Sequence, residues 1–283
     1  MNQIITRRKF CQLVAASYSA AMFASLAKKT LAQEAPPLLY GVSAVSGGVV
    51  LQSLDLTTDE VQDLSDRTVD ITLEPNERLS GFTVLPDNTL VLATAPTTSS
   101  IIGNPANLSR LIFVDTSPQT LAEFPGLGQR STIESLLATQ DGQLLSIVSL
   151  NQGTPPFRRA YINRQTGKVT FINELSVPSN QRLSNLTQGP DGTIYATSIR
   201  GEGGTSLVQL DLEQGQVISL SQLSFNNRPL RNDVSSLACS PSNQLYALGN
   251  PAYQRTNSVF TIDVNTGAMA RLRKFDVDEI TFA

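Results

Sequence analysis

Two stretches near the C-terminus repeat one pattern: "PDGTIYATSIRGEGGTSLVQLDLEQGQVISL" (residues 190–220) and "SNQLYALGNPAYQRTNSVFTIDVNTGAMARL" (residues 242–272). Each contains a tight turn, a short strand, a longer loop, a second strand, another turn and a third strand. A repeated all-β unit of about 50 residues is typical of a β-propeller, where radial repetition leaves few exposed sheet edges. The repeat therefore predicts the fold, but it does not identify a ligand.

Turn residues set the register of the repeat. Dipeptides that tolerate the positive φ angles of a two-residue hairpin recur at intervals of 54, 50 and 51 residues. They begin at Asp87, Asp141, Asp191 and Ser242. A second series of turn residues follows the next strand and comprises Asp55, Asp115, Asn163, Asp211 and Asp263. We predict that these side chains form turns and that the repeated aspartates are not catalytic acids.

The two ends of the chain are predicted to complete one blade. Residues 38–42 match the second strand of the other blades, and residues 278–283 match a first strand. Pairing of the C-terminal strand with the N-terminal one closes the ring and removes a free sheet edge. We predict one propeller domain over residues 38–283 with five four-stranded blades. The predicted blades are 275–283 with 38–66, then 76–127, 130–177, 181–224 and 231–274.

The segments 193–217 and 244–268 resemble the blades of YVTN- and NHL-type β-propeller proteins. They share an aliphatic-Tyr pair, a loop, a hydrophobic strand, an Asp and then a Gly. Blades two and three lack the Tyr, and blade two has Pro118-Gln119 where blades three to five carry Gly. The resemblance implies a blade architecture and does not imply a particular activity.

The N-terminal 32 residues have the features of an export signal. Arg7, Arg8 and Phe10 form a twin-arginine pattern, which is followed by a 15-residue run rich in Ala, Ser and Leu. This signal resembles those of the twin-arginine translocation family, which implies export of a folded protein by that translocase. We predict a signal peptide over 1–32, a linker over 33–37, and no membrane span in the mature chain. The expected location is the bacterial periplasm, the exterior, or a thylakoid lumen in a cyanobacterium.

The mature chain is predicted to be acidic. Residues 1–32 hold five of the 21 basic residues and none of the 24 acidic ones, so removal leaves 16 basic residues and a net charge of −8. A chain of this charge lacks the attraction to phosphate and to anionic lipid that nucleic-acid and membrane-surface binding require. We expect a protein or carbohydrate partner and no nucleic acid.

The composition excludes several kinds of chemistry. The chain has no histidine, which excludes Ser–His and Cys–His nucleophile pairs and His-ligated metals. Only Cys239 remains after signal removal, and its apolar surroundings predict a buried, inert thiol. What remains is carboxylate chemistry, with Glu134, Asp233 and Glu279 as candidate acids at the central channel. A hydrolase of glycosides or lactones is the alternative function, and it would admit calcium as a cofactor.

The leading hypothesis is a non-enzymatic binding or scaffold protein without a cofactor. Its ligand would meet the face that carries the longer loops between second and third strands, predicted at 43–48, 95–109, 149–158, 199–205 and 249–257. Arg78 and Arg182 lie opposite acids at the strand entries, where the charges either pair with one another or form a polar mouth. The candidate ligand-binding residues are Arg78, Arg182, Asn185, Arg200, Tyr253 and Arg255.

Overall fold

The chain divides into two units, Met1–Pro36 and Pro37–Ala283. The computed structural model describes residues 38–45, 48–64, 71–74, 76–97, 109–114, 119–201, 204–231, 234–251 and 256–282. The predicted signal peptide with Arg7, Arg8 and Phe10, and the predicted linker at 33–37, lie outside these ranges. Within them every regular element is a β-strand, and none is a helix that could cross a bilayer.

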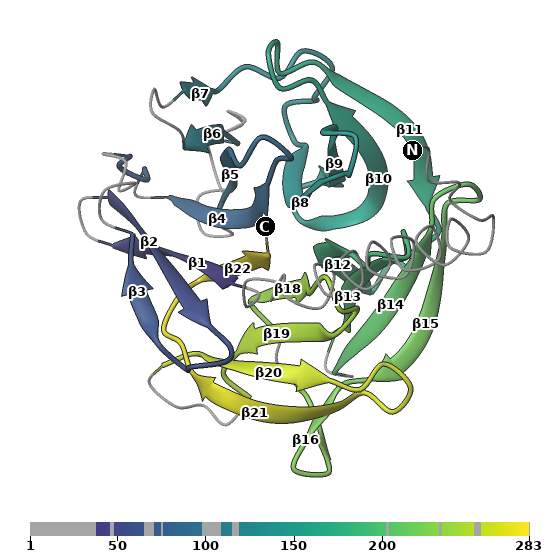
Figure 1. Cartoon of the computed structure of the whole chain (residues 1–283). Helices are drawn as coiled ribbons and strands as arrows, with labels where there is room; N and C mark the ends of the chain where they lie inside the picture. The colour runs from purple at the N-terminus through teal and green to yellow at the C-terminus, as the bar shows by residue number, and fades with distance from the viewer. Residues whose placement is uncertain are drawn as a thin grey trace, which may run out of the picture. The chain divides into compact units, whose positions relative to one another are not determined.

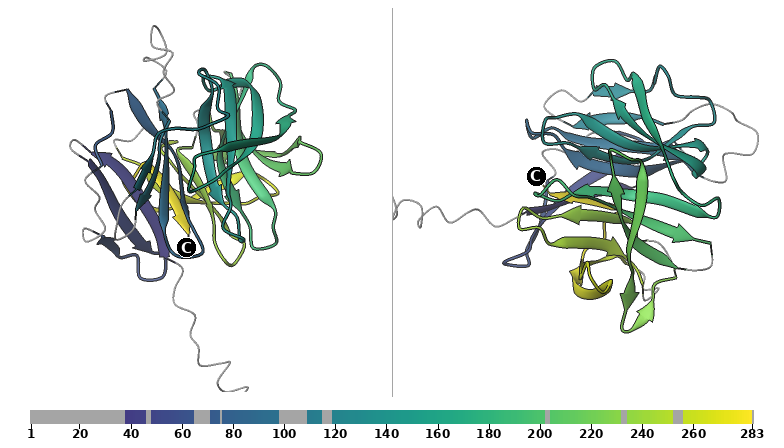
Figure 2. Two further views of the ribbon diagram at one scale, coloured as in Figure 1. Left: turned by 90° about the horizontal axis from the view of Figure 1, so that it is seen from above. Right: turned by 90° about the vertical axis from the view of Figure 1, so that its right-hand side faces the viewer.

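The fold is the predicted five-bladed β-propeller, in which each blade is an antiparallel sheet (Figure 1; Figure 2). Blade one contains β22 (Glu279–Phe282), β1 (Leu38–Val45), β2 (Gly48–Asp55) and β3 (Val61–Asp63). Blade two contains β4 (Glu77–Val84), β5 (Leu90–Pro96), β6 (Leu111–Val114) and β7 (Gln119–Leu121). Blade three contains β8 (Thr132–Ala138), β9 (Leu144–Asn151), β10 (Thr154–Ile162) and β11 (Val169–Leu175).

Blade four contains β12 (Gln181–Gln188), β13 (Ile194–Arg200), β14 (Thr205–Asp211) and β15 (Gln216–Gln222). Blade five contains β18 (Ser236–Cys239), β19 (Leu245–Gly249), β20 (Ser258–Ile262) and β21 (Ala268–Lys274). A feature that the sequence did not predict extends this blade to six strands. The hairpin of β16 (Ser224–Phe225) and β17 (Arg228–Pro229) pairs with β21 in parallel, so it covers the outer edge of blade five.

The C-terminal strand closes the ring, as predicted. β22 pairs antiparallel with β1, with Leu39 opposite Phe282 and Val42 opposite Glu279. Figure 1 shows the innermost strands β22, β4, β8, β12 and β18 around the centre, and each contacts its neighbours in that order. The chain therefore leaves no gap between its first and last strands, where an open edge would otherwise expose unpaired backbone groups.

The hydrophobic core is divided among the five interfaces between blades. Each interface has its own cluster of buried side chains, because alternate residues of a strand face the two neighbouring blades. The largest fully buried side chains include Phe157, Phe260 and Phe275, which belong to three different interfaces. Burial of apolar surface between blades is the main source of stability for this arrangement.

Hydroxyl groups also join adjacent innermost strands. At four of the five interfaces, a Ser or Thr oxygen accepts a hydrogen bond from a backbone N–H of the next blade. The pairs are Thr83 Oγ1 with Ala138 N (2.9 Å), Ser135 Oγ with Leu186 N (2.6 Å), Thr187 Oγ1 with Cys239 N (2.9 Å) and Ser236 Oγ with Ile280 N (3.1 Å). These bonds satisfy amide groups that have no strand partner on the channel side.

The repeated Asp and Asn residues that the structure describes form turns, as predicted, while Asp115 lies outside the described residues. Oδ1 of Asp263 accepts the amides of Asn265 at 2.9 Å and Thr266 at 3.2 Å. The same pair of contacts recurs at Asp55, Asn163 and Asp211. The second residue of each tight-turn dipeptide has a positive φ, and these residues are Asn88, Gly142, Gly192 and Asn243.

Two of the five predicted long loops are wrong. In blade one Val45 pairs with Gly48, so most of the predicted loop belongs to β1 and β2. In blade three Asn151 pairs with Thr154, so the connection is a two-residue turn. Gln152 (φ 54°) and Gly153 (φ 80°) supply the left-handed backbone that such a turn requires. Pro155 and Pro156 favoured a loop in the sequence, but they occupy a bulge of β10 where the ladder does not use their missing N–H groups.

Candidate functional site: the channel mouth

Two cavities lie at the ends of the innermost strands. One, of about 440 Å³, is formed mainly where these strands begin, and we call it the mouth. Its lining residues are Ala44, Leu73, Glu77, Arg78, Leu79, Ser80, Glu134, Ser184, Asn185, Val234, Ser235, Asp278 and Glu279. The other, of about 320 Å³, lies among the tight turns. Charged side chains line the mouth, whereas the described lining of the other cavity has none.

Three innermost strands have a β-bulge at the same level of the mouth. The strand registers shift between Leu79 and Gly81 in β4, between Ile133 and Ser135 in β8, and between Ser184 and Thr187 in β12. Each shift adds one residue to the inner strand, which turns a side chain out of the regular alternation. The residues within the bulges that line the mouth are Ser80, Glu134 and Asn185. A hydroxyl, a carboxylate and an amide are thereby brought to one cavity from three blades.

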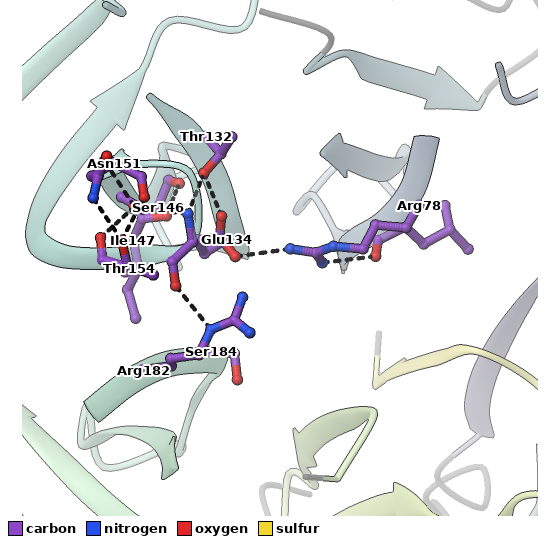
Figure 3. Close-up of polar contacts among 12 residues, drawn as sticks. Arg78, Thr132, Glu134, Ser146, Ile147, Asn151, Thr154, Arg182 and Ser184 are labelled. Atoms are coloured by element: carbon purple, nitrogen blue, oxygen red, sulfur yellow. Dashed lines mark hydrogen bonds and ion pairs between the residues drawn. The ribbon is translucent and has the colours of Figure 1, made fainter. Parts of the chain in front are cut away.

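A chain of hydrogen bonds crosses the mouth from blade two to blade four (Figure 3). Arg78 Nη2 lies 2.8 Å from Glu134 Oε2, and Thr132 Oγ1 donates to Glu134 Oε1. Gly153 N donates to Thr132 Oγ1 at 3.1 Å, and Gly153 O accepts from Arg182 Nε at 2.9 Å. The chain fixes both guanidinium groups beside one carboxylate, with the side chain of Glu134 only 6 % exposed and that of Arg78 39 % exposed.

Gly153 lets these groups approach one another. A Cβ at this position would lie 2.6 Å from Arg182 Nη2 and 3.4 Å from Glu134 Oε1. Its φ of 80° is also unfavourable for any residue with a side chain. The tight β9–β10 turn thus places the backbone of Gly153, without a side chain, next to the mouth. The sequence had predicted a long loop here.

The wall of blade two is held by a second ion pair. Arg110 Nε donates to Glu77 Oε1 at 2.7 Å and its Nη2 pairs with Glu77 Oε2, while Glu77 Oε2 also accepts the amide of Glu74 at 2.9 Å. A hydrogen bond to the Glu77 carboxylate raises the pKa of the Arg110 guanidinium. Arg110 Nη2 also donates to Thr72 O, which fastens the segment 71–74 beside the mouth. Glu77 therefore stabilises the wall of the mouth, and both of its carboxylate oxygens already have partners.

Ser80 and Asn185 are held differently. Ser80 is 5 % exposed, and its Oγ has no hydrogen-bond partner among the residues that the structure describes. Asn185 has a left-handed backbone (φ 60°), and its Nδ2 donates to Thr197 Oγ1 at 3.0 Å and Val234 O at 2.8 Å. Buried hydroxyls normally have partners, and left-handed non-glycine residues are uncommon, so both features mark a specialised site.

Two of the three candidate acids, Glu134 and Glu279, line the mouth. Glu134 is bound by Arg78 and Thr132, Glu279 lines the mouth from blade one, and Asp233 lies outside the described residues. Asp278, also on blade one, is exposed, and its Oδ2 accepts the amide of Ala44 at 2.7 Å. No group of three or more His, Cys, Asp or Glu side chains suited to a metal ion occurs in the described part of the chain.

Of the predicted ligand-binding residues that the structure describes, three lie at the mouth and one lies away from it. Arg78 and Asn185 line the mouth, and Arg182 reaches it through Gly153. Arg200 is exposed at the end of β13, and it is absent from the mouth lining because β13 is the second strand of its blade. Tyr253 and Arg255 lie outside the described residues. Sequence reasoning missed Ser80 and Thr132 as individual site residues because a bulge and a two-residue turn create their roles.

Cys239 lies at the other end of the channel and is buried, as predicted. Burial raises the pKa of its thiol to about 11. Its Sγ contacts Asn243 Oδ1 at 3.6 Å and Ser240 O at 3.7 Å, which are acceptors for a protonated thiol. These surroundings disfavour the thiolate that a nucleophile would need.

No protein-family model matches the sequence, and no curated protein matches it. Among solved structures, a protein of unknown function from Dyadobacter fermentans is 9 % identical, with a TM-score of 0.50 over 86 % of this chain and 83 % of that one. The gluconolactonase XC5397 from Xanthomonas campestris is 13 % identical (TM-score 0.48, 86 % and 77 % covered). The Pseudomonas aeruginosa periplasmic gluconolactonase PpgL is 12 % identical (TM-score 0.46, 87 % and 98 % covered). At these identities the similarity is one of fold alone.

Proposed function

We propose that this protein is a binding protein that holds a small polar ligand in the mouth of its propeller. The observation that carries the proposal is the set of three bulges at one level, which direct Ser80, Glu134 and Asn185 into the same cavity. Bulges disrupt strand pairing and are frequent beside functional sites, where they redirect side chains. A cavity of about 440 Å³ falls within the usual size range of small-molecule sites.

Binding is favoured over hydrolysis because both oxygens of Glu134 already have protein partners. Both of its oxygens are engaged, one by Arg78 and the other by Thr132. A general acid or base needs a carboxyl oxygen that can reach the substrate. In hydrolysis of a glycoside or lactone, the pairing of Glu134 with Arg78 would compete with proton transfer to the substrate. A second acid would also be needed, for which Asp233 and Glu279 remain the candidates, with or without calcium.

Export to the periplasm or beyond the cell is part of the proposal. It is supported by the twin-arginine pattern of Arg7, Arg8 and Phe10, and by the acidic composition of the chain beyond residue 32. A binding protein in that location would meet solutes or partners from outside the cytoplasm. Fractionation of cells that express the full chain, with Arg7 and Arg8 replaced by Lys, tests this element separately.

Ser80→Ala is the sharpest variant for the binding site. The hydroxyl has no partner among the described residues, so its removal should not lower the melting temperature. The probes are a panel of small molecules that bear hydroxyl, carboxylate and amine groups, screened by ligand-observed NMR and then titrated by calorimetry. We expect a panel member to bind with an affinity that Ser80→Ala reduces about threefold or more.

The matched control is Ser240→Ala at the opposite cavity. Ser240 Oγ accepts the amide of Gln244 at 3.1 Å, so this variant loses stability while the mouth stays intact. Its affinity for the mouth ligand should match that of the unaltered protein. Turnover of glycoside or lactone substrates that is lost in Glu134→Gln would instead establish the hydrolase and overturn the binding-only proposal.

A further inference from the structure

The net charge around the mouth differs between its sides, although Glu77 and Glu134, which are paired with Arg110 and Arg78, also line the side that carries the arginines. Arg78 and Arg182 stand on blades two and four, whereas Asp278 and Glu279 stand on blade one. We infer that the mouth takes a zwitterion, a molecule with a carboxylate at one end and an ammonium group at the other. This inference rests on the proposed function and specifies the chemical class of its ligand.

The positive wall is built from two guanidinium groups around one carboxylate. Arg78 pairs with Glu134, and Arg182 is fixed by Gly153 O, so two positive charges face one negative charge there. The bonds that fix them use Nη1 and Nη2 of Arg78 and Nε of Arg182, and each guanidinium has further N–H donors. Guanidinium groups held in place in this way suit the two oxygens of a carboxylate.

The negative wall is formed where the last strand of the ring begins. Asp278 is anchored on both sides, because its amide donates to Val42 O at 2.8 Å and its Oδ2 accepts Ala44 N at 2.7 Å. Glu279 follows it and is 8 % exposed. A carboxylate whose position is fixed by backbone bonds can receive an ammonium group without a large loss of side-chain entropy.

A second observation, independent of the charges, points to a ligand between the two walls. The buried hydroxyl of Ser80 lines the same cavity and has no hydrogen-bond partner among the residues described. Buried hydroxyls normally have a hydrogen-bond partner. A polar ligand that spans the walls would pass over this group and could bond to it.

A ligand of one charge fits this arrangement less well. An anion bound at Arg182 would leave Asp278 facing it across the same cavity, and a cation at Asp278 would face the two guanidinium groups. Such an ion would also displace water from the opposite wall without replacing its hydrogen bonds. A molecule with both charges satisfies both walls at once.

The test is a calorimetric titration with a series of amino acids of increasing length. The probes are glycine, 4-aminobutyrate, 6-aminohexanoate and triglycine, and the last distinguishes a short peptide from a free amino acid as the source. For the best member, the N-acetylated form keeps only the carboxylate and the amide form keeps only the ammonium group. We expect each one-charge form to bind at least about tenfold more weakly than the zwitterion.

Charge-removing variants assign the two ends. Arg182→Gln should weaken the zwitterion and the N-acetylated probe but not the amide, and Asp278→Asn should weaken the zwitterion and the amide but not the N-acetylated probe. The matched controls are Arg271→Gln on the exposed face of β21 and Glu213→Gln in a turn, neither of which lines the mouth. Both controls should bind as the unaltered protein does.

The outcomes separate this inference from the proposed function. Equal affinity for the zwitterion and either one-charge form would overturn the inference, as would a lack of binding by the whole series. If another polar molecule then binds in the mouth with an affinity that depends on Ser80, the proposed function stands without the zwitterion. If no molecule depends on Ser80, both fail.

Discussion

Arg78 Nη2 of blade two lies 2.8 Å from Glu134 Oε2 of blade three, and this contact joins two blades at the rim of the central cavity. The same carboxylate accepts the hydroxyl of Thr132, which in turn accepts the amide of Gly153. These residues of the mouth therefore form one hydrogen-bonded network, so substitution of any member should change the stability contributed by the others.

Loss of Arg78 should destabilise the protein through Glu134. Arg78→Met leaves a buried carboxylate with Thr132 as its remaining described partner, and we expect a loss of about 1.5–3 kcal/mol in the free energy of unfolding. In the double variant Arg78→Met/Glu134→Gln the charge is gone and part of this loss should be recovered. Urea denaturation of both single variants and the double variant measures the coupling, and strictly additive losses would refute it.

Gly153→Ala should lower stability by more than the cost of placing a side chain at a positive φ, and it should also weaken binding at the mouth. Its φ of 80° makes any side chain unfavourable, by about 1 kcal/mol, and the new Cβ would lie 2.6 Å from Arg182 Nη2. Gly192→Ala is the matched control, since Gly192 has a φ of 85° and no atom lies within 4 Å of the place that a new methyl group would take. Thermal melts should show a larger loss for Gly153→Ala, and only that variant should weaken mouth binding.

Ser135→Ala should weaken the contact between blades three and four and so lower the free energy of unfolding. Ser135 Oγ accepts the amide of Leu186 at 2.6 Å, and its removal leaves a buried N–H without a partner, at a cost of about 1–3 kcal/mol. Ser146→Ala is the control, because Ser146 is similarly buried but its Oγ donates to a carbonyl, Ile147 O. Chemical denaturation should rank Ser135→Ala as the less stable variant; the reverse order would contradict this role.

The turn aspartates should make the fold sensitive to acid. Backbone hydrogen bonds lower the pKa values of Asp55 and Asp263, chiefly through the amides of Thr57 and Asn265. The stability that these carboxylates contribute is complete above their unfolded pKa, about 3.8, and is lost as the pH falls through the lower folded values. Asp263→Asn should keep the turn, as Asn163 does in blade three, but weaken the acid dependence below about pH 4 in melts at stepped pH.

Cys239 should be protected in the native state and sensitive to alkali. Burial raises the pKa of its thiol to about 11, so the folded chain holds the proton that the unfolded chain releases near pH 9. The stability that the thiol contributes is therefore complete below about pH 9 and declines as the pH rises towards 11. Thiol titration with a chromogenic disulfide at about pH 8 should show no reaction until denaturant is added, and Cys239→Ala should lose the alkaline decline.

The blades could be predicted from the sequence because their signals are local. Each tight turn carries a dipeptide that tolerates positive φ, and the side chain of Asp or Asn closes the next turn within its own few residues. The pairing of the last strand with the first could be predicted as well, since residues 278–283 complete a pattern that blade one otherwise lacks. These features recur around the ring, so each one supports the others.

The mouth could be predicted only in part because its geometry departs from the repeat. Strict alternation along the inner strands places Asn185 a step away from Ser80 and Glu134. Asn185 was a predicted ligand residue, but the bulge that brings it into the cavity adds one residue without a sequence signal. The two-residue turn at Gln152 and Gly153 was hidden by the prolines that follow it, although a Gly after a polar residue was the available signal.

The most direct test of the mouth as the binding site compares Ser80→Ala with the unaltered protein in one experiment. Calorimetric affinity for the panel and the melting temperature are measured on the same samples. The account predicts an unchanged or higher melting temperature together with an affinity reduced about threefold or more. An unchanged affinity for every molecule that binds, or no binding across the panel, would contradict it.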